Sequence, residues 1–253
     1  GTDCIGLDTP IVALRSLGVT FTHCFSSDSD PRAKAHILRN FTPTVWFDDI
    51  LRRDNRSADT PSVRLYISGF PCQPYSSAGK RKGKEDERHL WPEMLRAIRE
   101  IQPRWVVGEN VLGLVNWSGG LVFHEVQADL EAEGYEVQPF LLPAAAVGAP
   151  HKRDRIWFIA YSNSARLHKQ YIPTKSKEKI SHSGIFNEKR NFSSFPTQPP
   201  ICGGDDGIPK ELDSITFSKW RNQSIKGYGN AIVPQVAYEI FKAIQSFDDL
   251  VNV

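Results

Sequence analysis

Short runs of β-branched and aromatic residues alternate with longer amphipathic segments along the first two-thirds of the chain. The runs are bounded by turn residues, and each predicts a β-strand. The predicted strands cover residues 20–27, 44–47, 63–68, 104–109, 135–142 and 155–161. The segments between them repeat apolar residues at helical spacing, which predicts helices over 10–18, 31–41, 90–101 and 121–134. Strands that alternate with helices favour a largely parallel sheet with helices on both faces.

The predicted strands at 135–142 and 155–161 follow one another with no helical pattern between them. A parallel pair needs a long crossover connection, so we expect one of these two strands to run antiparallel. The fold class is therefore α/β, a Rossmann-like sheet with one antiparallel strand.

The alternation ends at Asn163. Residues 163–195 are polar, basic and rich in Ser, Lys and Asn, which indicates a small irregular region. A final helix is predicted over 234–247, after the turn "KGYGN". We therefore divide the chain into a main domain at 1–162, the irregular region at 163–195, and a segment at 196–253 that returns to the main domain. The opening "GTDCIGLDTP" looks like the turn after a first strand, and almost no strand precedes it, so we expect residues before Gly1 to be missing.

Composition narrows the function classes. The chain has 253 residues, of which 40% are hydrophobic and 24% charged, as in ordinary globular proteins. A formal net charge of +2 does not indicate nucleic-acid binding by itself, so such binding would need local basic patches. The apolar runs are too short to span a bilayer, and we expect no membrane partner. The four cysteines lie far apart with no C-x-x-C pair, which argues against a zinc site or a disulfide framework and for a reducing, intracellular compartment. We predict no metal.

Cys72 lies just after a predicted strand, in "GFPCQPYSSAGKRKGKEDER". Ligands of doubly wound sheets bind beyond the carboxyl ends of the strands, where this residue is expected. An ordinary cysteine is only about 3% thiolate at pH 7, and the basic residues that follow would increase that fraction. The alternative is a buried, inert thiol, which Cys72 taken alone favours.

Two other strand ends carry charged side chains. In "VVGENV", Glu109 can act as an acid or as a hydrogen-bond anchor. In "HKRDRIW", Arg153 and Arg155 are two residues apart and share a face of a strand, a pattern that suits carbonyl or phosphate oxygens. The alternatives are a surface glutamate and an exposed ion pair at a sheet edge.

Taken in order, "SGFPCQPYSSAGKRKGKEDER", "GENV", "HKRDRIWFIAY" and "GYGNAIVPQVA" resemble the motifs of the cytosine-5 DNA methyltransferases, over about residues 1–237. The resemblance implies a class I methyltransferase sheet, a target-recognition region at 163–195, S-adenosylmethionine as cofactor and double-stranded DNA as partner. The sequence departs from the family in two places. The F-x-G-x-G turn keeps only Gly6, and the R-x-L-T-x-x-E stretch is not recognisable.

The resemblance also implies roles for the catalytic residues. Cys72 matches the cysteine whose thiolate attacks C6 of cytosine. Glu109 matches the glutamate that binds N3 and N4 of the ring. Arg155 matches the arginine on the O2 side, and Arg153 supports it. No residue is assigned as the base that removes the C5 proton, and water can serve.

Cofactor residues are assigned in the same way. The backbone of Cys4, Ile5, Gly6 and Leu7 would cradle the methionine part, Asp28 would bind the ribose and Asp49 the adenine amino group. Pro71 and Asn230 are further cofactor-side positions. A helix cap before Pro31 is the alternative for Asp28, and a plain turn before a helix is the alternative for Asn230.

In the family, the segment after P-C-Q is a loop that closes on DNA. Its phosphate-binding residues here would be Ser76, Lys80, Arg81, Lys82 and Lys84. A solvated surface loop is the alternative for each of these residues, because Glu85 to Glu87 keep the net charge of the stretch low.

The sequence therefore predicts a monomeric DNA cytosine-5 methyltransferase, of the restriction-modification, phage or orphan kind, that acts on a flipped-out base. An RNA cytosine-5 methyltransferase would use the same motifs. A catalytically silent DNA-binding relative is a further alternative, although it would have no chemical need for Cys72, Glu109 and Arg155. An unrelated thiol enzyme such as a peroxidase would not explain "GENV" or "GYGN".

Overall fold

The computed structural model describes residues 1–57, 59–70, 90–149, 151–162 and 231–251. The strands in these ranges are β1 (Thr2–Asp3), β2 (Phe25–Ser27), β3 (Val45–Phe47), β4 (Leu65–Ser68), β5 (Trp105–Val111), β6 (Glu136–Pro143) and β7 (Asp154–Tyr161). The helices are α1 (Thr9–Ser16), α2 (Pro31–Asn40), α3 (Trp91–Ile101), α4 (Gly113–Asn116), η2 (Trp117–Gly120), α5 (Leu121–Ala132), η3 (Ala144–Val147) and α7 (Pro234–Val251).

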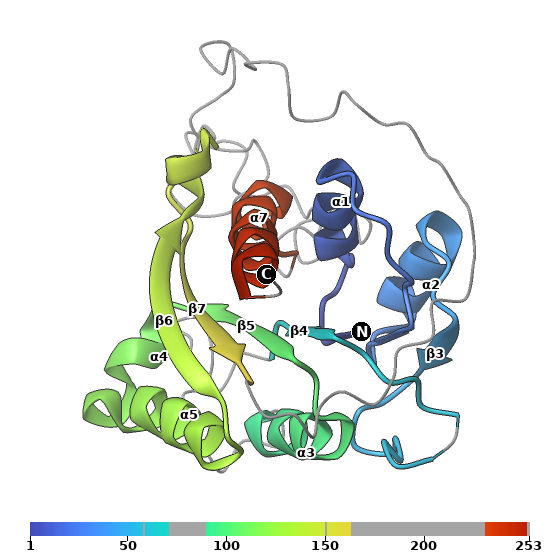
Figure 1. The fold of residues 1–253 in the computed structure, drawn as a ribbon, viewed down its shortest axis with the longest axis horizontal. Coiled ribbons are helices and arrows are strands. Elements are labelled where there is room, and N and C mark those ends of the chain that lie inside the picture. Colours follow the sequence, from blue (N-terminus) through green and yellow to red (C-terminus); the bar gives the residue numbers. More distant parts are fainter. Residues whose placement is uncertain (58, 71–89, 150, 163–230, 252–253) are drawn as a thin grey trace, which may run out of the picture.

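The strands form one seven-stranded sheet in the order β3-β2-β1-β4-β5-β7-β6 (Figure 1). Neighbours from β3 to β5 pair in parallel, whereas β7 is antiparallel to both β5 and β6. The prediction of one antiparallel strand is thus confirmed. The chain leaves β1 toward β2 and returns on the other side as β4, so a topological switch point lies between β1 and β4. In open α/β sheets, ligands bind at the carboxyl ends of the strands beside such a point.

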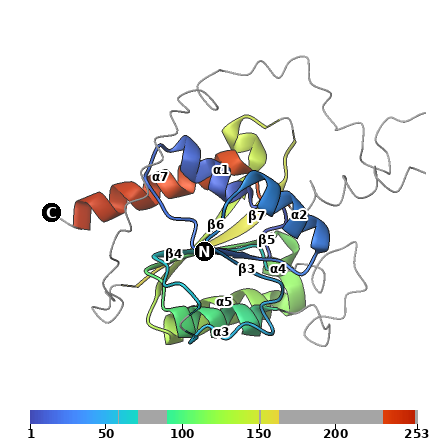
Figure 2. The same ribbon diagram turned by 90° about the vertical axis from the view of Figure 1, so that its right-hand side faces the viewer.

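Helices cover both faces of this sheet, with α1, α2 and α7 on one side and α3 and α5 on the other (Figure 2). Successive residues of a strand point to opposite faces. In β4, Tyr66 therefore joins the core beneath α3 and α5, while Ile67 joins the core beneath α1 and α7. Val106 and Val107 of β5 divide between the two cores in the same way. This explains why the sheet strands read as continuous apolar runs.

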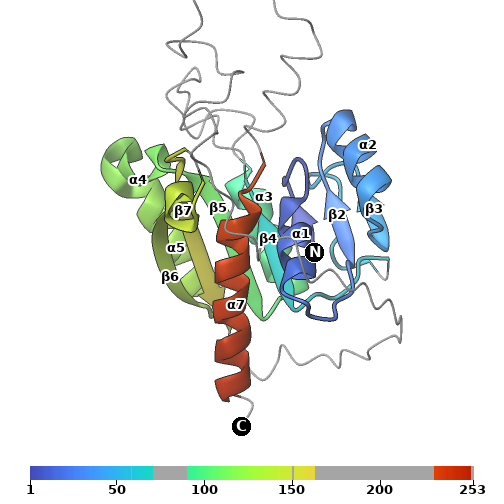
Figure 3. The same cartoon turned by 90° about the horizontal axis from the view of Figure 1, so that it is seen from above.

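Helix α7 lies beside α1 across the middle of the sheet, although the two are far apart in sequence (Figure 3). Ile5 and Ala13 from the start of the chain share a core with Val236, Ala237 and Phe241 of α7. The Thr9 hydroxyl at the start of α1 donates a hydrogen bond to the carbonyl of Ile232 over 2.5 Å. Residues near the two ends of the described chain are therefore packed as one unit.

The strand boundaries differ from the prediction where a partner strand is short or long. The strand predicted over 20–27 forms only over its last residues, because β1 offers only Thr2 and Asp3 as partners on one side of β2. Conversely, β5 extends to Val111, since β7 pairs with it along its whole length. Glu109 and Asn110 thus lie inside β5 rather than just past its end.

Within the described residues, every helix is too short or too polar to traverse a lipid bilayer.

Candidate active site

Three strand ends converge around Gly69, which directly follows β4. A Cβ atom at this position would lie 3.1 Å from the carbonyl oxygen of Cys4 and 3.9 Å from Oε2 of Glu109. The first distance is tighter than most Cβ contacts, so a side chain here would push the Cys4 carbonyl away, and glycine keeps the space where the turn after β1 meets β5. The glycine of the "GFPCQ" motif therefore allows the close approach of the segments that carry Cys4 and Glu109.

Glu109 and Arg155 form an ion pair at this end of the sheet. The distance between Nε of Arg155 and Oε1 of Glu109 is 3.1 Å, and the side chains are 20% and 13% exposed, respectively. The strand register produces the contact, because Arg155 lies opposite Val111, two residues beyond Glu109 on the same face. The structure thus brings together two residues that the sequence assigned separately.

Burial raises the pKa of Glu109, and the nearby charges of Arg155 and Arg153 offset part of this effect. A carboxylic acid whose pKa is raised by burial retains its proton to higher pH than a surface glutamate does. Glu109 can therefore hold a proton for donation to a buried acceptor, with Arg155 available to stabilise the ionised form.

Two polar residues hold the chain segments that border this site. The side-chain amide of Asn110 is buried and donates a hydrogen bond to the carbonyl of Phe70, the last described residue before Cys72. Arg153 has a φ of 43°, a left-handed conformation, and donates from Nη2 to the carbonyl of Ala231 over 2.6 Å. Arg153 thereby fixes the first described residue after Asn230, a contact that the sequence did not suggest.

The turn at Cys4–Leu7 is tied to β2 through Asp28. The Asp28 carboxylate accepts hydrogen bonds from the backbone N–H of Gly6, over 3.0 Å, and from that of Asp30, over 2.9 Å. Burial raises the pKa of Asp28. The side chain that caps α2 is that of Asp30, which accepts from the backbone N–H of Arg32, so the helix-cap alternative for Asp28 is wrong.

The other cofactor candidates differ in how they face the site. The side chain of Ile5 is buried in the core beneath α1 and α7, which leaves only its backbone for a ligand. Burial raises the pKa of the Cys4 thiol well above its ordinary value, so this thiol is protonated at neutral pH. Asp49 is 28% exposed and accepts a hydrogen bond from the backbone N–H of Leu51.

Several predicted residues fall outside the described residues, and their roles stay predictions. These are Pro71 and Cys72, the loop residues Ser76, Lys80, Arg81, Lys82 and Lys84, and Asn230.

A buried ionic cluster, not anticipated from the sequence, lies beside the turn at Cys4–Leu7. Asp3 and Arg53 form an ion pair in which both side chains are fully buried, and Tyr66 donates a hydrogen bond to the same carboxylate. A second buried carboxylate, that of Asp8, accepts from Thr2 and Ser26. The available signal was the aspartate directly before the predicted turn after a first strand, because a carboxylate in the interior of a sheet calls for a buried partner.

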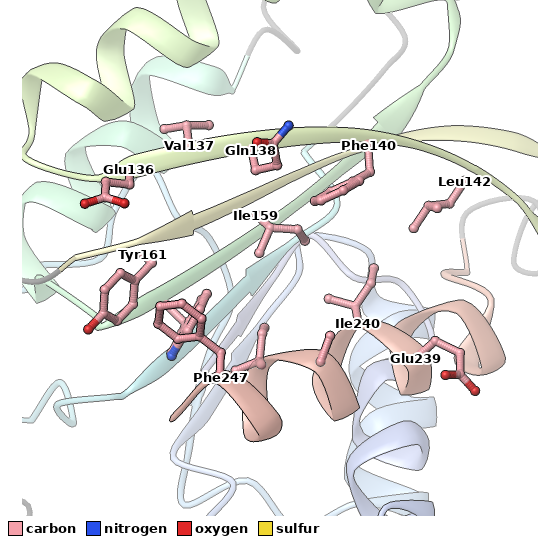
Figure 4. A pocket seen from close by; sticks show the side chains of 13 residues that line it. Glu136, Val137, Gln138, Phe140, Leu142, Ile159, Tyr161, Glu239, Ile240 and Phe247 are labelled. Atoms are coloured by element: carbon pink, nitrogen blue, oxygen red, sulfur yellow. The ribbon is translucent and has the colours of Figure 1, made fainter. Parts of the chain in front are cut away.

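An apolar groove of about 570 Å³ lies elsewhere, between α7 and the outer strands β6 and β7. Phe140 and Ile159 form one wall and Ile240 and Phe247 the other, and Glu136 and Glu239 mark its two ends (Figure 4). None of the candidate site residues lines it, so this groove is separate from the site around Gly69.

Among the described strands, β7 alone runs antiparallel in a doubly wound sheet. With charged side chains near the carboxyl ends of the central strands, this is the Rossmann-like fold of the class I methyltransferases. The solved structure of an E. coli prophage-encoded protein, described as a DNA modification methyltransferase, shares this fold with a TM-score of 0.52. The two sequences are 21% identical, and the match covers 65% of this chain and 47% of the other.

Residues 6–199 match the family of C-5 cytosine-specific DNA methylases, and the chain belongs to this family. It is 34% identical to the Type II methyltransferase M.Bsp6I of Bacillus sp. (strain RFL6), over 85% of this chain and 69% of the relative. It is 35% identical to the Type II methyltransferase M.BspRI of Lysinibacillus sphaericus, over 65% of this chain. That match spans only 39% of the relative's length.

Proposed function

We propose that this protein transfers a methyl group from S-adenosylmethionine to C5 of a cytosine in double-stranded DNA. The observation that carries the proposal is the ion pair between Glu109 and Arg155 beside Gly69. This ion pair places a carboxylic acid and a guanidinium beside the end of β4, and Cys72 follows β4 four residues later in the sequence. The names of the Type II relatives support a role as the modification enzyme of a restriction-modification system, or as a phage or orphan form.

The strand ends around β1 and β4 suit S-adenosylmethionine. Gly69 leaves the space beside Cys4 free of a side chain, so a ligand can approach the backbone of the turn. Asp28 fixes that turn through Gly6, and its other carboxylate oxygen accepts a hydrogen bond from the backbone N–H of Asp30 just before α2. Cys4 to Leu7, Asp28 and Asp49 would hold the cofactor, with Pro71 and Asn230 as further contacts. When bound, the cofactor supplies a methyl group on a positively charged sulfur.

C5 of cytosine is a poor nucleophile, so the ring needs activation before it can accept the methyl group. The Cys72 thiolate adds to C6 and forms a sulfur–carbon bond, and the electron pair of the C5–C6 double bond becomes available at C5. C5 would then accept the methyl group that bound S-adenosylmethionine supplies, and the cofactor would leave as the neutral thioether. A base removes the C5 proton, the double bond reforms, and the cysteine leaves.

Glu109 and Arg155 act on the polar edge of the base in this scheme. A protonated Glu109 donates to N3 as negative charge develops on the ring, and burial, which raises its pKa, favours this protonated form. Arg155 donates to the O2 oxygen while it keeps Glu109 oriented. Because the base must leave the helix to reach these groups, the enzyme flips it out, at a cost of a few kcal/mol.

The proposal is tested with tritiated S-adenosylmethionine and duplex DNA, followed by mapping of the modified cytosines. We expect tritium at C5 of cytosine in a defined sequence. A Cys72→Ser variant should retain DNA binding but lose methyl transfer, since a serine hydroxyl is a far weaker nucleophile than a thiolate. Methyl transfer by this variant at the parental rate would overturn the mechanism. A parallel reaction with RNA separates the two substrate classes, because label in RNA alone would contradict the DNA assignment.

A further inference from the structure

We propose that the buried Asp3–Arg53 pair is a positioning element for the cofactor site. In this proposal it sets the distance between the turn at Cys4–Leu7 and the loop that carries Asp49. The inference rests on the proposed function, because it assumes that these two segments bind opposite ends of S-adenosylmethionine.

The geometry of the pair is that of a rigid, two-point connection. Arg53 donates from Nη1 to Oδ1 of Asp3 over 2.7 Å and from Nη2 to Oδ2 over 2.6 Å. Both side chains have no exposed surface, and Tyr66 donates a third hydrogen bond to Oδ2. Two parallel hydrogen bonds fix the orientation of the guanidinium as well as its distance.

Further contacts restrict the guanidinium. It lies over the rings of Phe25 and Phe47, at 4.6 and 5.2 Å from their centroids, and so contacts side chains of β2 and β3. Its Nε donates to the side-chain oxygen of Asn55, whose amide in turn donates to Glu100 of α3. All three guanidinium nitrogens of Arg53 therefore donate a hydrogen bond.

The two ends of this connection belong to the two halves of the candidate cofactor site. Asp3 is the last residue of β1 and directly precedes Cys4, which adopts a left-handed φ of 55°. Arg53 lies four residues after Asp49 in the loop that follows β3. Arg96 of α3 holds the same loop by donating to the carbonyls of Ile50 and Arg53. A shift of the guanidinium would therefore displace the Asp49 loop relative to the Cys4 turn.

Stability alone does not require an ionic pair at this place. Replacing a buried ion pair by apolar residues of similar volume is often neutral or stabilising, whereas removing one partner is strongly destabilising. An apolar pair would fill the same space but would lack directional bonds, so it would leave the loop free to move against the turn. The double substitution therefore separates positioning from stability.

The test compares the Asp3→Leu/Arg53→Met double variant with the parent protein. Without ligand, we expect the same midpoint of cooperative urea unfolding. Hydrogen exchange should be faster at residues 48–57 of the variant and unchanged in β4 and β5. The Kd for S-adenosylmethionine, measured by titration calorimetry, should rise at least tenfold. Arg56→Met is the matched control, because Arg56 is 76% exposed on the same loop, and it should leave both the exchange and the Kd unchanged.

Three other results are possible, and each leads to a different conclusion about the Asp3–Arg53 pair or about the proposed function. A double variant with the parental Kd and exchange rates overturns the positioning role while the proposed function stands. A double variant that no longer unfolds cooperatively assigns the pair to the stability of the sheet and also overturns the proposal. A parent protein that binds no S-adenosylmethionine contradicts the proposed function itself.

Discussion

At the scale of single residues, Glu109 has the environment with the clearest chemical consequence. It combines burial, which favours the neutral acid, with two arginines that favour the ionised form. The burial is the larger effect and raises the pKa, so the folded protein binds the Glu109 proton more tightly than the unfolded chain does. The charge state of this residue is therefore linked to folding.

This linkage predicts a pH dependence of stability. Below the ordinary glutamate pKa of 4.5, Glu109 is protonated in both states and its contribution to stability is complete. As the pH rises through the folded-state pKa, the folded protein must hold a buried charge, and stability falls. The Glu109→Gln variant removes that fall. The free energy of unfolding of the variant minus that of the parent should therefore increase from about pH 4.5 toward neutrality, in urea titrations at each pH.

The control for this experiment is Glu136→Gln, which changes an exposed glutamate at the start of β6. Its side chain is in contact with water, so this substitution should not reproduce the increase expected for Glu109→Gln. A flat difference for Glu109→Gln would mean that burial does not govern the proton affinity of this residue.

Some residues of the site could be predicted from the sequence, and others could not. Glu109 and Arg155 are recognisable because each is a charged group next to an apolar run, but their contact depends on the register of β5 against β7. Asp3 and Arg53 were not anticipated at all. Their pairing spans fifty positions, and no local pattern specifies which buried aspartate meets which arginine.

At the scale of elements, local periodicity accounts for much of the fold. The helices at 31–40 and 91–101 nearly coincide with the predicted segments, because their apolar faces repeat at a helical period and proline marks their first turns. The six predicted strands were placed correctly, and β3, β6 and β7 agree with the prediction within one residue at each end, whereas the lengths of β2 and β5 differ from it. Strand length depends on the neighbouring strand, as the short β1 and β2 and the long β5 and β7 show.

Two leucines of α5 test whether the face of this helix that packs on the sheet contributes more to the free energy of unfolding than its exposed face. Leu130 is fully buried in the core beneath the sheet, whereas Leu121 of the same helix is 68% exposed. Leu130→Ala should lower the free energy of unfolding by about 2–5 kcal/mol, because it leaves a cavity, and Leu121→Ala by about 0.5 kcal/mol or less. Urea unfolding followed by tryptophan fluorescence measures both. Equal losses would indicate that α5 does not pack on the sheet through Leu130.

At the scale of the whole molecule, the contact between α1 and α7 joins the two ends of the described chain. Ala237 is fully buried at this contact, while Ala243 of the same helix is exposed. Ala237→Asp should therefore cost about 4 kcal/mol or more, because it buries an unpaired charge, and Ala243→Asp should cost about 0.5 kcal/mol or less. Thermal unfolding provides the comparison.

The same pair of variants also reports on the site. If α7 supports the turn before α1, Ala237→Asp should weaken S-adenosylmethionine binding and Ala243→Asp should not. Parental affinity and parental stability in Ala237→Asp would contradict the packing of α7 against α1.

The hydrogen bond from Thr9 to Ile232 has a consequence for biosynthesis. The two residues are 223 positions apart in sequence, so the segment with Thr9 is synthesised well before its partner. A nascent chain that has completed β1 to β7 still lacks α7, so Ile67, Val107 and Trp157 lack the part of their core that α7 supplies until residues 234–251 are made. Chains that have not yet reached this helix expose apolar surface, which favours their association with one another.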